Sequence, residues 1–313
     1  MTKYIKNFKE LSSKDTKIAG GKGASLGEMA QVKIPVPPGF VVLAFAFERF
    51  IKETDINVEI DAMWDRLDVA NTEEIERNSE IMQSLIISKD FPKDLAKEIV
   101  KEFDKLKIRY VAVRSSATAE DSKLDAWAGQ LESYLYVDKK DLLKSVQKCW
   151  ASLFTPRAIF YRLERKLQKN KISVAVVIQK MVNSDVSGVC FTVHPVTKDK
   201  DQMIIEACWG LGEALVQGII TPDSYVLEKS TLNIIDINIG SQEKMIVKAK
   251  EETEEKPVPE NKKEKQKLTE VQIKELAKIC MNIEKHYGDP RDIEWALGGD
   301  KFYIVQSRPI TTL

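Results

Sequence analysis

The sequence has few of the residues that mark several large classes of protein. It contains two histidines and four cysteines, and no two cysteines form a C-x-x-C pair. Because the cysteines have apolar flanks, we expect reduced core thiols of a cytoplasmic protein. No stretch approaches the ~20 apolar residues of a membrane helix. Residues 1–11 lack the apolar segment of a signal peptide, so we expect neither a membrane segment nor a signal sequence.

An excess of charge of one sign is also missing. Lys plus Arg and Asp plus Glu both number 48, so the formal net charge is zero. Without a global positive field, the composition gives no indication of a nucleic-acid partner. A chain of 313 residues with 43% hydrophobic content can bury a large core, which predicts two lobes rather than one.

Two common phosphate-binding motifs are absent. The spacing G-x-x-x-x-G-K is not found, and no G-x-G-x-x-G follows a predicted strand. Instead, residues 19–29 form a glycine-rich turn that enters a helix. Its backbone N–H groups and the Lys22 ammonium would favour an anion there. The same pattern by itself is also typical of a simple turn, so both interpretations stay open.

The last strand pattern predicts a β-hairpin over residues 292–309, around a Gly-Gly-Asp turn. We expect Glu294 to lie opposite Gln306, and Asp292 opposite Arg308. Carboxylate and amide oxygens suit Mg²⁺, and a guanidinium suits phosphate. The other interpretation is a solvated face with surface ion pairs. The alternation assigns four residues of the second strand to one shared face: Phe302, Ile304, Gln306 and Arg308.

A third cluster begins with an apolar strand at residues 110–113 that ends in Arg114. An arginine at a strand end can hold phosphate oxygens with two parallel hydrogen bonds. The Ser/Thr/Gly-rich residues 115–129 are expected to fold over a triphosphate as a lid, before a second strand at 133–137. Alternatively, Arg114 pairs with one of the acidic residues that follow it on the surface.

The remaining segments fix the expected organisation. Residues 48–107 and 141–168 have mostly helical patterns, and residues 174–182 form a near-continuous apolar strand. Residues 248–267 are rich in Lys and Glu and lack an apolar period, which predicts an exposed linker. Thr269 opens a helix with a capping box.

Eight runs, in order between about residues 18 and 312, resemble the ATP-binding region of phosphoenolpyruvate synthase and pyruvate phosphate dikinase: GGKGASLGEM, VPPGF, VAVRSSATAED, AGQLES, CWASLFTPRAIFYR, VIQKMVNSDVSGVCFT, WGLGEALVQGIITPDSY and DIEWALGGDKFYIVQSRPIT. The resemblance implies a two-lobed α/β (α+β) ATP-grasp fold with ATP between the lobes. We assign residues 1–180 to the first lobe and residues 181–313 to the second.

The resemblance also implies roles for individual residues. Lys22, Arg114 and Arg308 would bind phosphates and act as the catalytic cations. Glu294 and Gln306 would hold Mg²⁺, with Gln306 also at the nucleotide. Further ATP contacts are implied, with adenine near the last four of these residues: Gly129, Gln130, Ser133, Gln179, Lys180, Met181 and Val182.

The resembling family passes phosphate through a histidine in a T-x-G-G-x-x-x-H motif. Neither His194 nor His286 has that setting, so we expect structural roles for both. The resemblance then implies ATP-dependent phosphorylation of a histidine on a separate carrier domain or subunit, with AMP and phosphate as products. Three other interpretations stay open: the ATP subunit of a split relative such as phenylphosphate synthase, the matching part of a rifamycin phosphotransferase, and a non-catalytic ATP-binding module.

Overall fold

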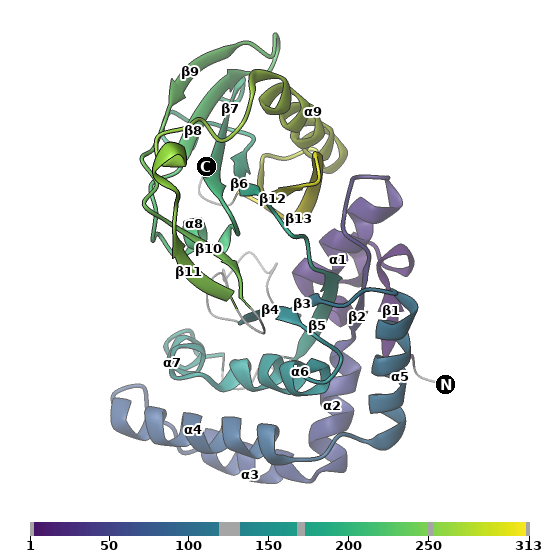
Figure 1. Ribbon diagram of the computed structural model, residues 1–313. Coiled ribbons are helices and arrows are strands. Elements are labelled where there is room, and N and C mark those ends of the chain that lie inside the picture. Colours follow the sequence, from purple (N-terminus) through teal and green to yellow (C-terminus); the bar gives the residue numbers. More distant parts are fainter. Residues whose placement is uncertain (1–2, 119–131, 168–172, 250–252, 311–313) are drawn as a thin grey trace. The chain divides into compact units, whose positions relative to one another are not determined.

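The computed structural model describes most of the chain: residues 3–118, 132–167, 173–249 and 253–310 (Figure 1). Helices and strands alternate irregularly along these residues, so the predicted mixed α/β class is confirmed. Within the described ranges, no helix is long and apolar enough to cross a membrane. All four cysteines are buried and free.

The chain divides into two compact units. The first comprises residues 1–28 and 38–181, and the second comprises residues 29–37 and 182–313. Residues 29–37 belong to the second unit, although the residues before and after them belong to the first. A backbone hydrogen bond connects this segment to the second unit, since the Ile304 N–H donates to the Pro35 carbonyl at 2.9 Å. Nothing in the hydrophobic pattern of this proline-rich stretch reveals that assignment.

The first unit is built on an antiparallel sheet in the order β1-β2-β5-β3-β4. Its strands are β1 (Ile5–Asn7), β2 (Gly39–Val42), β3 (Val111–Ala117), β4 (Ser133–Val137) and β5 (Val174–Lys180). Strand β3 is longer than predicted, because Ser115, Ser116 and Ala117 continue to pair with β5. Arg114 therefore lies within the strand and not at its end, and the first residues of the expected lid are strand residues.

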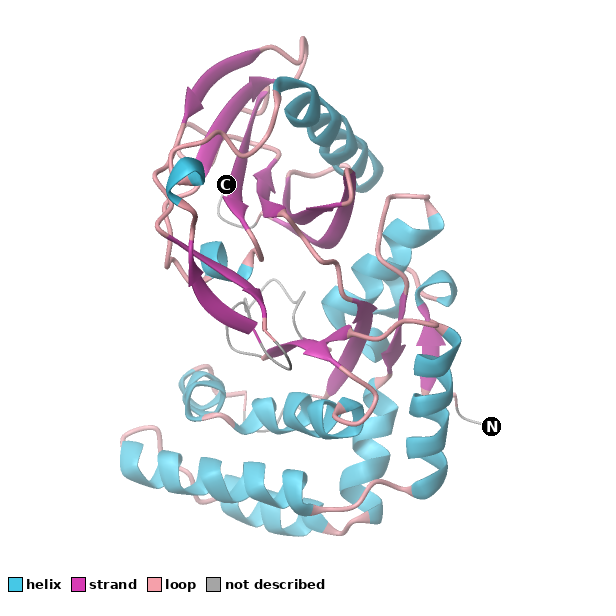
Figure 2. Cartoon of the chain, in the orientation of Figure 1, coloured by secondary structure: helices cyan, strands magenta, loops and turns pink. Residues whose placement is uncertain are grey.

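Among the described residues, seven helices belong wholly or mainly to the first unit: α1 (Thr16–Gln31), α2 (Ala44–Glu53), α3 (Ile56–Trp64), α4 (Thr72–Ser88), α5 (Lys93–Lys105), α6 (Leu142–Ala151) and α7 (Pro156–Glu164). Short 3-10 turns occur at Phe8–Glu10, Ser13–Asp15 and Ser152–Phe154. Helices α2 to α7 gather beside the sheet (Figure 2). Thr155 caps the start of α7, since its hydroxyl accepts from the Ala158 N–H at 3.3 Å.

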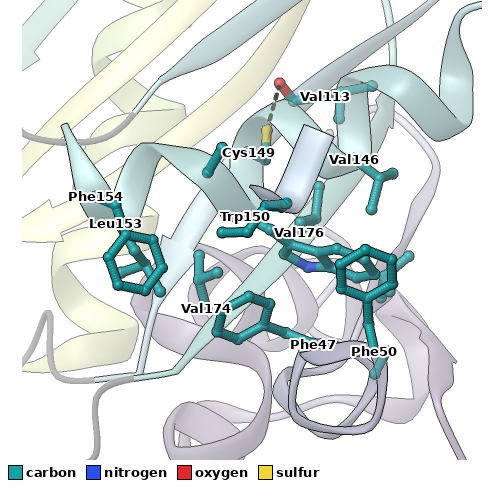
Figure 3. Close-up of a cluster of buried hydrophobic side chains, with 14 of the residues drawn as sticks. Phe47, Phe50, Val113, Val146, Cys149, Trp150, Leu153, Phe154, Val174 and Val176 are labelled. Carbon is teal, nitrogen blue, oxygen red and sulfur yellow. Dashed lines mark hydrogen bonds between the residues drawn. The ribbon is translucent and has the colours of Figure 1, made fainter. Parts of the chain in front are cut away.

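Helices α2 and α6 pack on one face of this sheet, and the other helices of the group pack against them or against one another to complete the core of the unit. Trp150 of α6 packs against Phe47 and Phe50 of α2, with ring centroids 5.8 and 5.0 Å apart (Figure 3). Alternate strand residues such as Val113 complete the cluster. Because side chains alternate along a strand, the residues between them, including Arg114, project from the opposite face.

The second unit is built on an antiparallel sheet in the order β13-β12-β6-β7-β8-β9. Its strands are β6 (Val186–Phe191), β7 (Gln202–Trp209), β8 (Asp223–Glu228), β9 (Ile234–Asn238), β12 (Arg291–Gly298) and β13 (Lys301–Pro309). The unit also contains α8 (Glu213–Val216), α9 (Glu270–Tyr287) and a 3-10 turn at Glu260–Lys262. Helix α9 packs on β7 and β12 (Figure 1), and its Thr269 capping box is confirmed.

The segment expected as an exposed linker, residues 248–267, has more structure than predicted. Its described part includes β11 (Thr253–Pro257), which pairs with β10 (Lys244–Lys248) in a two-stranded ribbon. Val258 is buried, and the Lys267 side chain is fully buried against Asp223. The prediction of an exposed linker is wrong at these positions. A two-stranded ribbon of charged residues can form without an apolar period, and one buried ion pair produces no periodic pattern in the sequence. Hydrophobic periodicity therefore could not predict either feature.

The hairpin at the end of the chain contains a β-bulge that the sequence did not reveal. Gly298 pairs with Lys301, so the turn consists of Gly299 and Asp300, both with positive φ (57° and 58°), as a two-residue type I′ turn requires. Strand pairing shifts by one residue between Glu294 and Trp295, and Val305 is the additional residue of β13.

The bulge divides β13 into two parts with opposite alternation. Ile304 pairs with Trp295 and both are buried, whereas Gln306 pairs with Glu294 beyond the bulge. Phe302 and Ile304 therefore do not share a face with Gln306 and Arg308, and that prediction is wrong. The two pairs predicted for the site, Glu294 with Gln306 and Asp292 with Arg308, are confirmed.

Candidate nucleotide-binding site

In the first unit, three of the predicted nucleotide-binding residues lie on the sheet face opposite the helical core. Arg114 pairs with Ser133 of β4, and Ala112, two residues before Arg114, pairs with Gln179 of β5. Residues directly opposite in neighbouring strands share a face, so Arg114, Ser133 and Gln179 project from the same side. Ser133 is exposed and Arg114 is half-buried.

The side-chain amide of Gln179 is buried without a hydrogen-bond partner among the described residues. The side chain is only 2% exposed, and the atom that lacks a partner among those residues is Nε2. Leaving a buried amide donor unsatisfied costs about 1–3 kcal/mol. Native proteins rarely keep such a group unless it meets a ligand or water. The position of Gln179 therefore suits a polar contact to a bound molecule.

The next three predicted residues follow Gln179 where the chain passes from the first unit to the second. The Lys180 N–H donates to the Pro38 carbonyl at 2.8 Å, and the Met181 N–H donates to the Tyr110 carbonyl at 3.1 Å. These two amides are already engaged within the protein. Adenine contacts from Lys180 and Met181 would therefore use carbonyl oxygens or side chains. Val182 is half-buried at the start of the second unit.

Lys22 lies in α1, directly after a kink in the helix. Gly20 has φ 67° inside α1, a conformation that glycine adopts without strain, and regular helix continues beyond it. The Gly23 N–H donates to the Ser116 hydroxyl of β3 at 3.3 Å. Because Ser116 and Arg114 are two residues apart on one strand, the turn of Lys22 is joined to the strand face that carries Arg114.

The charge of Lys22 also affects the pKa of a thiol on the helical side of β3. Burial raises the pKa of the Cys149 thiol in α6, Glu132 raises it further, and Lys22 lowers it. The Cys149 thiol itself lies 3.7 Å from the Val113 carbonyl (Figure 3). The Lys22 ammonium is thus within electrostatic range of the strand on which Arg114 lies.

In the second unit, the hairpin carries the predicted metal and phosphate residues. Glu294 and Gln306 lie directly opposite each other in the antiparallel pair, so their side chains project from the same face. One pair further along, the Arg308 Nε–H donates to Asp292 Oδ2 at 2.9 Å, and Nη2 forms an ion pair with the same oxygen at 2.7 Å. The Arg308 side chain remains half exposed, so its guanidinium is accessible to an anion while Asp292 orients it.

Glu206, which the sequence analysis did not identify, lies in line with Glu294 and Gln306 across the neighbouring strands of the sheet. Glu294 pairs with Val189 of β6, and Val189 pairs with Glu206 of β7. Glu206 therefore shares a face with Glu294 and Gln306. A lone carboxylate within the apolar run of β7 is the signal that would have identified it.

These carboxylates make the face locally rich in negative charge. Burial raises the pKa of Glu206, and the charge of Asp292 raises it further. Burial also raises the pKa of Asp292, against the opposing effect of Arg308, and Glu294 adds to the rise. A cation on this face would reduce the mutual repulsion of the three carboxylates.

The residues present fit Mg²⁺. Glu294 offers carboxylate oxygens and Gln306 an amide oxygen, the hard ligands that Mg²⁺ prefers. No group of three or more His, Cys, Asp or Glu residues is placed to hold a metal ion within the described ranges. Mg²⁺ commonly keeps several waters and takes phosphate oxygens as ligands, so two protein ligands suffice for a nucleotide-bound ion.

Neither histidine has the surroundings of a phosphate carrier. His194 Nδ1 accepts the backbone N–H groups of Val196 and Thr197 at 3.2 and 3.1 Å, which closes the turn after β6. His286 lies in the last turn of α9, with its ring edge-on to Tyr287. Both positions have a structural explanation, as the sequence predicted.

Two predicted contacts, Gly129 and Gln130, and most of the expected lid lie outside the described residues. Their roles stay predictions. For the other predicted site residues, the structure gives positions within one unit. Lys22, Arg114, Ser133, Gln179, Lys180 and Met181 belong to the first, and Val182, Glu294, Gln306 and Arg308 belong to the second.

Comparison with known proteins gives consistent matches over nearly the whole chain. A probable phosphoenolpyruvate synthase of Methanocaldococcus jannaschii is 49% identical over 99% of this chain and 27% of its own length. The phosphoenolpyruvate synthase of Pyrococcus furiosus is 42% identical over 99% of this chain and 44% of its own length. Rifampicin phosphotransferase of Bacillus cereus is 39% identical over the full chain and 36% of its own length.

The chain thus spans between about a quarter and about a half of the length of these curated relatives. Residues 16–313 match the family described as pyruvate phosphate dikinase, AMP/ATP-binding domain. The ATP-grasp fold implied by the sequence resemblance agrees with this match and with the mixed α/β architecture. The chain belongs to the pyruvate phosphate dikinase AMP/ATP-binding domain family.

Proposed function

We propose that this chain binds Mg-ATP and uses it to phosphorylate a histidine on a separate carrier domain or subunit, with AMP and phosphate as products. The observation that carries the proposal is the hairpin, where Glu294 lies opposite Gln306 and Arg308 is oriented by Asp292. This arrangement of hard oxygens and an accessible guanidinium, in a chain of an AMP/ATP-binding family, suits a magnesium–nucleotide complex.

Each proposed residue has a distinct chemical role. Lys22 and Arg114 hold phosphate oxygens, and Arg308 holds another from the hairpin. Glu294 and Gln306 would hold Mg²⁺, which when bound neutralises charge on the phosphates. Phosphoryl transfer needs little covalent chemistry from the protein, so positioning and charge stabilisation supply most of the catalysis. Gln179, with its unsatisfied amide, supports a polar contact to the base.

The phosphate acceptor is proposed to be a histidine outside this chain. His194 and His286 are engaged in a turn and at a helix end. The curated relatives are two to four times longer than the matched region, which leaves room in them for a carrier. A phosphoenolpyruvate synthase and a rifampicin phosphotransferase both match this chain, so the final acceptor beyond the carrier follows from the partner and not from these residues.

Calorimetry with ATP, with and without Mg²⁺, tests the proposal. We expect one site in the wild-type protein. Glu294→Ala should weaken Mg²⁺-dependent binding by about 1.5–3 kcal/mol, because a charged contact is lost, and should change metal-free ATP binding much less. Glu254→Ala, an exposed carboxylate of β11, is the matched control and should bind like the wild type. Equal losses with and without Mg²⁺ would show that Glu294 holds no metal.

A non-catalytic ATP-binding module would bind Mg-ATP in the same way, so turnover must be measured separately. The isolated chain should convert ATP to AMP very slowly. Adding a protein that carries the T-x-G-G-x-x-x-H motif should produce phosphohistidine on that protein, detected by mass spectrometry. Rapid AMP formation without a second protein would contradict the requirement for an external acceptor.

A further inference from the structure

A single buried hydroxyl joins the turn of Lys22 to the strand of Arg114. The Ser116 side chain is fully buried, and its Oγ accepts the Gly23 N–H at 3.3 Å. Gly23 follows Lys22 directly, and Ser116 lies two residues beyond Arg114 on the same face of β3. One hydrogen bond therefore connects the turn of Lys22 to the strand of Arg114.

The contact between the turn and Ser116 is also close in space. A Cβ atom at Gly20 would lie 2.2 Å from Ser116 Oγ and 2.4 Å from the Ser116 carbonyl oxygen. Gly20 has a positive φ, which glycine adopts at low cost. The kink of α1 is thus seated directly on Ser116, and the position of the turn depends on the shape and the hydroxyl of this residue.

This bond changes how the glycine-rich turn can act on a phosphate. The sequence suggested that N–H groups of the turn would approach an anion. The Gly23 N–H instead donates to Ser116, so it is directed at the strand. The contribution of this part of the turn then depends on the Lys22 side chain, whose direction follows from how the turn is held.

We propose that Ser116 is a positioning residue, which holds the turn of Lys22 at a fixed distance from Arg114 so that both cations meet the phosphates of one nucleotide. The proposal rests on the proposed binding of ATP. It differs from a general packing role in one respect. Loss of the hydroxyl should weaken contacts to the triphosphate and leave contacts to the nucleoside unchanged.

Two variants separate the hydrogen bond from packing. Ser116→Ala removes the hydroxyl, and Ser116→Cys keeps the shape of the side chain with a somewhat larger sulfur atom that accepts hydrogen bonds weakly. Ser79→Ala is the matched control. Its buried hydroxyl donates to the Phe154 carbonyl at 2.7 Å within the helical part of the same unit, away from the proposed site residues. The measurements are ATP and adenosine affinity by calorimetry, and amide hydrogen exchange of residues 20–26 in the nucleotide-free protein.

We expect Ser116→Ala and Ser116→Cys to bind Mg-ATP roughly fivefold to tenfold more weakly, with unchanged adenosine affinity and faster exchange in residues 20–26. Ser79→Ala should match the wild type in all three measurements. Unchanged exchange in both Ser116 variants overturns the positioning role, whatever the wild type binds. ATP affinity of wild-type strength in Ser116→Cys also overturns it, because volume alone would then suffice. Wild-type protein that fails to bind Mg-ATP refutes the proposed function on its own.

Discussion

Replacing Lys267 with methionine should destabilise the second unit by about 3–5 kcal/mol, the usual cost of removing one partner of a buried ion pair. Lys267 Nζ lies 2.7 Å from Asp223 Oδ1 and 2.7 Å from the Gly240 carbonyl oxygen, and both charged side chains are fully buried. The pair ties the end of the charge-rich segment to the first residue of β8.

The magnitude follows from what remains after the substitution. Asp223 would keep three of its four hydrogen bonds, from the Tyr225 hydroxyl (2.6 Å), the Gly240 N–H (3.0 Å) and the Lys267 N–H (2.8 Å). Its charge, however, would have no buried counter-ion. In Asp223→Asn/Lys267→Met both charges are removed. The amide oxygen can still accept the two donors on the Oδ2 side, from Tyr225 and the Lys267 N–H, so much of the loss should be recovered.

Urea unfolding followed by circular dichroism measures these differences. Lys263→Met is the control, since Lys263 pairs with Glu243 and Glu260 at the surface, and it should leave the unfolding curve unchanged. If Lys267→Met unfolds within about 1 kcal/mol of the wild type, the buried pair does not stabilise the unit. If the double variant is less stable than Lys267→Met, the explanation by an uncompensated charge is wrong.

Two further predictions concern single side chains of the second unit. His194→Ala should cost roughly 1 kcal/mol of unfolding free energy, because two backbone donors lose their acceptor, whereas the side-chain oxygen of His194→Asn should restore it in the same urea assay. Glu206→Gln should raise the melting temperature near neutral pH. The pKa of Glu206 is raised in the folded protein, so stability in the wild type falls as pH rises through that pKa. The gain should shrink in mildly acidic buffer, and a gain independent of pH would contradict this explanation.

The site pairs of the hairpin were predictable from the sequence because they depend on local alternation. Asp292 and Glu294 on one strand, and Gln306 and Arg308 on the other, follow the period of two. The bulge at Val305 was not predictable, since its residue resembles its apolar neighbours and only the buried pairing of Trp295 with Ile304 reveals it.

Features that depend on distant contacts were missed. The hydroxyl residues after Arg114 predict a strand end there, but pairing with β5 extends the strand past them. The local charge pattern predicts an exposed Lys267, because its buried partners, Asp223 and the Gly240 carbonyl, lie 44 and 27 residues earlier in the sequence. No local pattern in the sequence indicates the role of Ser116, because its hydrogen bond joins it to Gly23, which is distant in the sequence.

The bulge has a consequence for how this hairpin can vary among relatives. Counted outward from the Gly299-Asp300 turn without a bulge, Val305 and not Gln306 would stand opposite Glu294. The turn and the end of the hairpin that carries Glu294 and Gln306 therefore keep separate registers, joined by one added residue. A relative can change its turn without changing the pairing of Glu294 with Gln306 if it keeps that residue. Transferring site residues by counting from the turn would instead select the wrong face of the strand.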